Sequence, residues 1–211
     1  MKLISMKELD DRILEEVALA VQQGKVVIFP TETIYGIGTN AFDESAVERI
    51  YKIKGRPEQK ALIVLINDYQ MLELIASITT DIERNLMKKF WPGPLTIIFQ
   101  KKNISCLSEN VTARKDTIAV RMSDNEIIKK LIEKSGVPIV APSANLSGSS
   151  SATKIKEIIS DLGEQVDYIL DNGDIKDETP STIVKVENGE IKILREGKIK
   201  KEQLFNMESI K

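Results

Sequence analysis

Short apolar runs and apolar stripes at helical spacing alternate along the chain. Runs such as VVIF at 26–29 and ALIVLI at 61–66 are typical of buried strands. Over residues 6–23 the apolar positions recur at helical spacing, which predicts an amphipathic helix that ends at Gly24. Strands that alternate with helices in this way predict an α/β fold.

The same two patterns predict the remaining elements. Further helices are expected over 43–55, 69–76, 81–90, 125–133 and 155–159. Further strands are expected over 95–99, 117–120, 138–141, 168–170, 183–186 and 191–194. The last two strands flank Asn188 and Gly189, a strong signal for a two-residue hairpin. A hairpin within an α/β pattern predicts a mixed sheet.

Composition narrows the chemistry that this domain can perform. Lys and Arg number 30 and Asp and Glu 32, so binding to nucleic acid would need a local basic patch. The chain has no histidine and one cysteine, Cys106, which excludes histidine-dependent nucleophilic catalysis and the usual zinc sites. Lysine, arginine, hydroxyl and backbone groups remain, and these groups suit phosphate and nucleotide ligands.

The apolar runs are far shorter than the ~20 residues of a membrane span. The first residues, MKLISMKELDD, carry acid where a signal peptide would carry its apolar stretch. A single cysteine cannot form an intramolecular disulfide, which fits a reducing compartment. We therefore expect a cytoplasmic protein that does not contact a membrane.

Three polar segments have the composition of ligand-binding loops. PTETIYGIGTNA at 30–41 follows a buried strand and is expected to be a loop, without the spacing of a dinucleotide fingerprint or P-loop. YKIKGRPEQK at 51–60 carries four cations and one carboxylate. APSANLSG at 141–148 presents hydroxyls and an amide. Taken singly, the segments are better explained by a structural interpretation, as a turn, a solvated charge cluster and a polar loop.

Together and in this order, the segments resemble the YrdC/TsaC family of threonylcarbamoyl-AMP synthases. The matching segments, from about Lys7 to Gly197, are PTETIYGIG, IKGRP, WPGPLT, TIAVR, APSAN, and STIV leading to REG. The resemblance is to the short, single-domain members. It implies a YrdC-like catalytic domain over 1–197, with a twisted, mixed open sheet flanked by helices, and a short tail over 198–211.

The resemblance implies an L-threonylcarbamoyladenylate synthase, a nucleotidyltransferase. Such an enzyme converts L-threonine, bicarbonate and ATP into threonylcarbamoyl-AMP and pyrophosphate. Downstream threonylcarbamoyl-transferase proteins then modify the adenosine next to the anticodon of tRNA. Mg²⁺ is expected on the phosphates, although no metal ligand stands out. The reaction needs positioning and cations, so the lack of histidine is no obstacle.

The resemblance also implies the site residues, position by position. Lys54 and Arg56 are expected to be catalytic. The expected ATP contacts are Lys54, Arg56, Lys60, Thr117, Ser143, Asn145, Ser151 and Arg195. The expected threonine contacts are Thr33, Arg121, Ala141 and Ser181, with Leu65 at a position where many relatives have histidine.

Leu65 is a departure from the family pattern. A site that hydrogen-bonds a hydroxyl group discriminates strongly, whereas an apolar site discriminates weakly. We therefore expect weaker threonine binding or looser amino-acid choice, with the ATP half of the site intact.

Two other functions remain open. One is a carbamoyl-adenylate-forming enzyme, like the related domain of hydrogenase maturation proteins. The other is an RNA-binding module without catalysis, whose basic surface would combine residues 52–60 with Lys101, Lys102, Arg114 and Lys115. The net charge of −2 and the few aromatic residues disfavour the RNA-binding module, although weak tRNA contact is compatible with catalysis.

Overall fold

The computed structural model describes residues 1–103, 106–149 and 152–205. Its strands are β1 (Lys2–Ser5), β2 (Val27–Phe29), β3 (Gly36–Asn40), β4 (Ile63–Ile66), β5 (Ala76–Ser77), β6 (Leu95–Lys101), β7 (Thr117–Met122), β8 (Ile139–Val140), β9 (Tyr168–Asp171), β10 (Thr182–Glu187) and β11 (Glu190–Arg195). Its helices are α1 (Asp11–Gln22), α2 (Glu44–Lys54), α3 (Tyr69–Ile75), α4 (Asp81–Phe90), α5 (Glu126–Ser135), α6 (Ile155–Leu162) and α7 (Lys201–Phe205), with a 3₁₀ turn at Gly163–Gln165.

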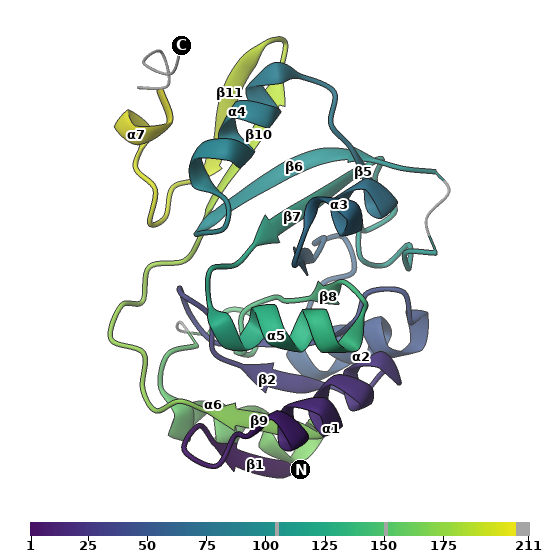
Figure 1. The fold of residues 1–211 in the computed structure, drawn as a ribbon, viewed down its shortest axis with the longest axis vertical. Coiled ribbons are helices and arrows are strands. Elements are labelled where there is room, and N and C mark those ends of the chain that lie inside the picture. Colours follow the sequence, from purple (N-terminus) through teal and green to yellow (C-terminus); the bar gives the residue numbers. More distant parts are fainter. Residues whose placement is uncertain (104–105, 150–151, 206–211) are drawn as a thin grey trace.

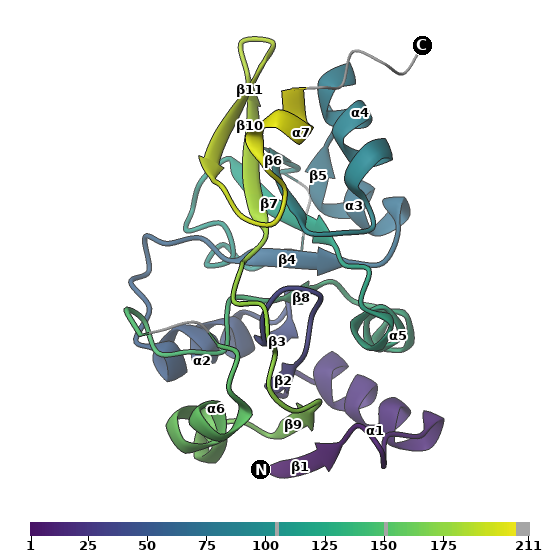
Figure 2. The ribbon, with the colours of Figure 1, turned by 90° about the vertical axis from the view of Figure 1, so that its left-hand side faces the viewer.

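The strands form one mixed sheet in the order β1-β9-β2-β3-β8-β4-β7-β6-β10-β11, and β5 pairs with β6. Neighbours such as β4 and β7 are parallel, whereas β3 and β8 are antiparallel. Helices α1 and α5 lie on one side of the sheet and α2 and α6 on the other (Figures 1 and 2). Two apolar cores fill the spaces between the sheet and its helices. The smaller core lies beneath α1 and α5. The expected α/β domain with a mixed open sheet is confirmed.

Local sequence explains why the helix limits were predictable. The Asp43 carboxylate accepts a hydrogen bond from the Ala46 amide at 3.0 Å, which caps the start of α2. Gly55 ends α2 in a left-handed conformation, with a φ of 57°. At α4 the Thr80 hydroxyl and Glu83 carboxylate form a reciprocal capping box.

The segment 30–41 differs from the expected loop, because its second half is strand β3. Two glycines make this strand possible between close neighbours. A Cβ on Gly38 would lie 2.3 Å from the Val140 carbonyl oxygen, and one on Gly36 would lie 2.8 Å from the Phe29 ring. Glycine has low intrinsic strand propensity, so the strand results from pairing with β2 and β8 and not from local sequence. Strands β1 and β5 were also not predicted.

Within the tail, residues 201–205 form the short helix α7. Leu204 is buried in the larger core, so this part of the tail packs against the domain. The division at residue 197 remains a prediction. None of the helices in the described part of the chain is both long and apolar enough to cross a membrane.

Candidate active site

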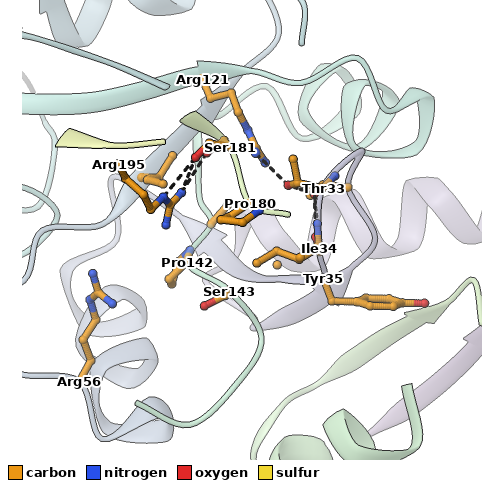
Figure 3. A pocket seen from close by; sticks show the side chains of 14 residues that line it. Thr33, Ile34, Tyr35, Arg56, Arg121, Pro142, Ser143, Pro180, Ser181 and Arg195 are labelled. Carbon is orange, nitrogen blue, oxygen red and sulfur yellow. Dashed lines mark hydrogen bonds between the residues drawn. The ribbon is translucent and has the colours of Figure 1, made fainter. Parts of the chain in front are cut away.

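Segments that are distant in sequence meet at one pocket (Figure 3). Strand ends supply Arg121 and Arg195, and the chain beyond α2 supplies Arg56. The complete lining is Thr31, Thr33, Ile34, Tyr35, Gly36, Arg56, Ile63, Arg121, Ala141, Pro142, Ser143, Pro180, Ser181 and Arg195. Three guanidinium groups and several hydroxyls around one pocket favour an anionic ligand.

Arg121 is the most deeply buried of the three arginines, with 5% of its surface exposed. Its Nη1 donates to the Thr33 hydroxyl at 3.1 Å and lies 3.5 Å from Glu32 Oε1. Burial lowers the pKa of Arg121, and the negative charges of Glu32 and Asp124 oppose that shift. Its buried Nε has no hydrogen-bond partner among the described residues. Arg121 therefore keeps donor capacity for a carboxylate ligand.

Glu32 supports Arg121 without lining the pocket. Its Oε2 accepts a hydrogen bond from the Ser123 hydroxyl, and its backbone carbonyl accepts one from the Lys198 ammonium group. Lys198 also lies 3.4 Å from Asp177. The sequence prediction assigned no role to Glu32 or Lys198. Glu32 stands inside the quoted motif PTETIYGIG, but its partner Lys198 is 166 residues away, so sequence gave no signal for the contact.

Arg195 and Ser181 form a second polar group on the pocket wall. Arg195 donates to the Ser181 carbonyl from Nε at 3.1 Å and from Nη2 at 2.8 Å, and to the Ser181 hydroxyl at 3.2 Å. The Ser181 hydroxyl also lies 2.9 Å from that of Thr96, within the segment WPGPLT. Burial lowers the pKa of Arg195, and the charge of Arg121 lowers it further. The two guanidinium groups thus share one electrostatic environment.

Arg56 forms the opposite wall of the pocket (Figure 3). Its Nε donates to the Lys60 carbonyl at 2.9 Å and its Nη2 to the Ala61 carbonyl at 2.7 Å. Burial lowers the pKa of Arg56. These backbone contacts fix the guanidinium while leaving its remaining N–H groups for a ligand.

Lys54 is not among the residues that line the pocket, although it was expected to be catalytic. It is 2% exposed, and its ammonium group donates to the backbone carbonyls of Ser143 and Asn145. Asn145 Oδ1 lies 3.4 Å from the same nitrogen. Burial lowers the pKa of Lys54 to about 7, and the charge of Arg56 contributes to the shift.

The structure brings only part of the expected set to the pocket. Thr33, Arg56, Arg121, Ala141, Ser143, Ser181 and Arg195 line it. Lys60 lies outside it and contributes a carbonyl to Arg56, and Thr117 lies outside it at the start of β7. Asn145 contacts Lys54 and Ser143, and Ser151 lies outside the described residues.

Leu65 was expected to face the amino acid, but it is fully buried in the smaller core and does not line the pocket. It pairs in register with Arg121 across the parallel strands β4 and β7. Ile63, two residues earlier on the same strand face, lines the pocket instead. Leu65 therefore lies next to the pocket wall, and its expected effect on threonine binding remains a prediction.

Some lining residues were not predicted. Thr31 donates to the Ile34 carbonyl at 2.6 Å and lies 2.9 Å from the Thr33 hydroxyl, so it shapes the turn that presents Thr33. Tyr35 points its hydroxyl away from the pocket, toward the Gly173 carbonyl at 2.7 Å (Figure 3). The hydroxyl-rich composition of the segment was the available signal for Thr31. Nothing local distinguished it from Thr33.

The fold and this pocket define an α/β protein with a cationic pocket that suits a small anionic ligand. Residues 19–197 match the model of the Sua5/YciO/YrdC family, described as telomere recombination. The chain belongs to this family, which confirms the resemblance found in the sequence.

Relatives with assigned names agree with the family. Threonylcarbamoyl-AMP synthase of Bacillus subtilis is 42% identical over 195 residues, which are 92% of this chain and 56% of that protein. The Pyrococcus abyssi enzyme of the same name is 40% identical over 87% of this chain and 54% of its own length. This chain thus spans about half the length of these two relatives. A putative threonylcarbamoyl-AMP synthase of Methanocaldococcus jannaschii is 39% identical and matches over 94% of both chains.

Solved structures show the same fold. The crystal structure of P. abyssi Sua5 complexed with L-threonine has a TM-score of 0.93 and 36% identity, covering 99% of this chain and 61% of that one. The structure of E. coli YciO has a TM-score of 0.81 and 25% identity, covering 93% of this chain and 95% of that one.

Proposed function

We propose that the chain is an L-threonylcarbamoyladenylate synthase, a nucleotidyltransferase that forms threonylcarbamoyl-AMP and pyrophosphate from L-threonine, bicarbonate and ATP. The observation that carries the proposal is the pocket in which Arg56, Arg121 and Arg195 stand among hydroxyl groups. The names of the relatives from B. subtilis and P. abyssi support this reaction, as does the L-threonine bound to the P. abyssi protein.

Threonine would occupy the deep part of the pocket. Arg121 has free donors for its carboxylate, and Thr33 and Ser181 offer hydroxyls nearby. Ala141 would pack against the side chain of the amino acid. A buried guanidinium binds a carboxylate well because its N–H groups match the two oxygens and little water competes for them.

ATP would lie toward Arg56, Ser143 and Arg195. These residues stand on the side of the pocket formed by the chain beyond α2, the segment after β8 and the end of β11. Contacts of ATP with Lys60, Thr117 and Asn145 stay predictions, because none of these residues lines the pocket.

The reaction needs no side-chain nucleophile. The neutral threonine amine attacks the carbon of bicarbonate, and loss of one water molecule leaves a carbamate. A carbamate oxygen attacks the α-phosphorus, and the bond to pyrophosphate breaks. Negative charge grows on the phosphate oxygens, so the fixed cations Arg56 and Arg195 would stabilise the transition state.

Mg²⁺ would accompany the phosphates. Among the described residues no group of three or more metal-ligating side chains occurs. Glu32, the carboxylate behind the pocket, is already engaged by Arg121 and Ser123. This donor set fits an ion held mainly by the phosphate oxygens, as Mg²⁺ often is in nucleotide sites.

The product would pass to downstream threonylcarbamoyl-transferase proteins in the cytoplasm, for tRNA modification. The basic surface considered for RNA is partly neutralised, because Lys101 forms an ion pair with Glu109 at 2.8 Å. Lys102 keeps its charge, but its ammonium group is held by the Glu73 carbonyl. This favours an enzyme over an RNA-binding module, with at most a weak tRNA contact.

The test is release of pyrophosphate from ATP by the purified chain, with threonine or bicarbonate omitted in turn. Release that requires both co-substrates is expected. Arg56→Gln should raise KM for ATP about 10- to 100-fold, since a charge-assisted hydrogen bond contributes about 1.5–3 kcal/mol. Pyrophosphate release that is independent of threonine, or unchanged in Arg56→Gln, would contradict the proposal.

A further inference from the structure

We propose that Lys54 is a positioning residue, whose ammonium group holds the polar segment 143–147 against the end of α2 and does not contact the phosphates. The inference deepens the proposed function, and it rests on that function only where the ligand is taken to be ATP. It assigns the two cations of the segment IKGRP to different tasks.

The contacts of Lys54 account for its whole donor capacity. An ammonium group has three N–H donors, and three oxygen atoms surround this one: the carbonyls of Ser143 and Asn145, and Asn145 Oδ1. The side chain is 2% exposed, so water cannot replace these acceptors without local opening. No N–H group remains for a phosphate oxygen in this arrangement.

The main chain of Lys54 adds a second attachment. Its carbonyl oxygen accepts a hydrogen bond from the Ser147 amide at 2.9 Å. One residue thus binds both the beginning and the end of the segment 143–147. Because Lys54 is the last residue of α2, its carbonyl is free of a helical partner and is available for this bond.

The opposite side of the segment is held by the sheet. The Ala144 amide donates to the Tyr35 carbonyl at 2.8 Å, and the Ile37 amide donates to the Pro142 carbonyl at 2.9 Å. Ser143, between these attachments, lines the pocket. With its carbonyl directed at Lys54, Ser143 keeps a partial negative charge away from an anionic ligand. Its hydroxyl donates to Asn145 Oδ1, so the same group of contacts also fixes the Ser143 side chain.

Arg56 differs from Lys54 because the chain turns between them. Gly55 has a φ of 57°, the left-handed conformation that ends α2, so residues 54 and 56 point in different directions. Arg56 lines the pocket and Lys54 does not. Within the K-x-R motif, Lys54 therefore supports the pocket wall and Arg56 faces the ligand.

Amide hydrogen exchange of the ligand-free protein, at about pH 6.5, tests the attachment directly. In Lys54→Met, exchange at the Ser147 amide should accelerate about tenfold or more relative to wild type, while β4 and β7 keep their protection. Lys52→Met is the matched control, since Lys52 is on the same helix with an exposed side chain. Arg56→Gln should weaken ATP binding without changing exchange at Ser147.

Unchanged Ser147 exchange in Lys54→Met would overturn the proposal, and so would equal acceleration in Arg56→Gln. Because no ligand is present, this result does not depend on whether the chain makes threonylcarbamoyl-AMP. If the proposed function is wrong, a separate measurement would show it, because pyrophosphate release would not depend on threonine.

Reductive methylation of the wild-type protein needs no variant and covers the case in which Lys54→Met does not fold. A Lys54 amine held by the segment should react about tenfold more slowly than Lys52, with or without ATP. A phosphate-binding Lys54 would instead react readily in the free protein and become protected when ATP is added. That second pattern would overturn the proposal.

Discussion

Arg121 and Glu32 form an ion pair behind the pocket, with Glu32 Oε1 3.5 Å from Arg121 Nη1. Their side chains are only 6% and 12% exposed. Glu32 offsets the charge of Arg121, while the Arg121 Nε, which has no hydrogen-bond partner in the described part of the chain, remains a donor for an anionic ligand. In such a pair, loss of one member leaves the other as an uncompensated buried charge. Substitution of Glu32 together with Arg121 should therefore restore stability without restoring threonine binding.

Arg121→Gln should lower the free energy of unfolding by about 3–5 kcal/mol, because the Glu32 carboxylate stays buried without its partner. The double variant Arg121→Gln/Glu32→Gln should recover most of that loss. Neither variant should bind threonine. Urea unfolding and calorimetric titration with threonine measure the two effects.

Glu32→Gln alone is the control for these two variants. Glutamine can still accept the hydrogen bond from Ser123, and Arg121 is intact. It should retain threonine binding. Threonine binding by the double variant would show that Arg121 is not the carboxylate partner.

Gly197 matters because of its close approach to the pocket wall. A Cβ at this position would lie 2.1 Å from the Pro180 carbonyl oxygen and 2.8 Å from that of Ser181. Backbone atoms cannot rotate away, so Gly197→Ala should displace Ser181 together with its bonds to Arg195. KM for threonine should rise by about tenfold, a cost of about 1.4 kcal/mol in binding.

Gly163→Ala is a matched control, because its nearest contact would be an ordinary 3.5 Å to an Ile159 methyl group. This variant should leave KM unchanged. An unchanged KM in Gly197→Ala as well would mean that the wall around Ser181 does not touch the amino acid.

Leu65 lies in register with Arg121 but is wholly buried in the smaller core. Leu65→His should lower KM for threonine by restoring a polar group beside Arg121. It should also cost about 1–3 kcal/mol of stability, because an imidazole replaces a packed side chain. Steady-state kinetics across threonine concentrations, with urea unfolding, separates the two consequences.

Leu131→His makes the comparison specific, since Leu131 is equally buried in the same core but on α5. It should lose stability without any gain in threonine binding. Equal KM values for threonine in wild type and Leu65→His would count against a role for residue 65 in the amino-acid site.

Local signals explain how far sequence could predict this fold. Asp43 and Gly55 define the ends of α2 through contacts within a few residues, so that helix was predictable. Strand β3 was not, because Gly36 and Gly38 are in a strand only through their neighbours β2 and β8. Tertiary pairing overrode local propensity there.

The candidate site also has a part that the sequence could predict and a part that it could not. Arg56, Arg121 and Ser143 were found because they belong to ordered motifs, which sequence displays directly. The different positions of the Lys54 and Arg56 side chains could not be predicted, since they depend on the left-handed turn at Gly55 and on where each side chain ends. Sequence spacing alone does not encode such directions.

The buried position of Lys54 also predicts a dependence of stability on pH. Burial, with a contribution from the charge of Arg56, lowers the pKa of Lys54 from 10.5 to about 7 in the folded protein. Between these two values the unfolded chain binds more protons than the folded one, so the free energy of unfolding should rise with pH across this window. The cost of keeping Lys54 charged is largest below about pH 7.

Lys54→Met removes this contribution, while other titrating groups remain in both proteins. The difference in unfolding free energy, wild type minus Lys54→Met, should therefore increase from about pH 6 to about pH 9, by at most about 1.4 kcal/mol per pH unit. Urea unfolding at several pH values measures it. A difference that stays flat over this range would mean that the pKa of Lys54 is not lowered into it, and that the three oxygen atoms around the ammonium group offset its burial completely.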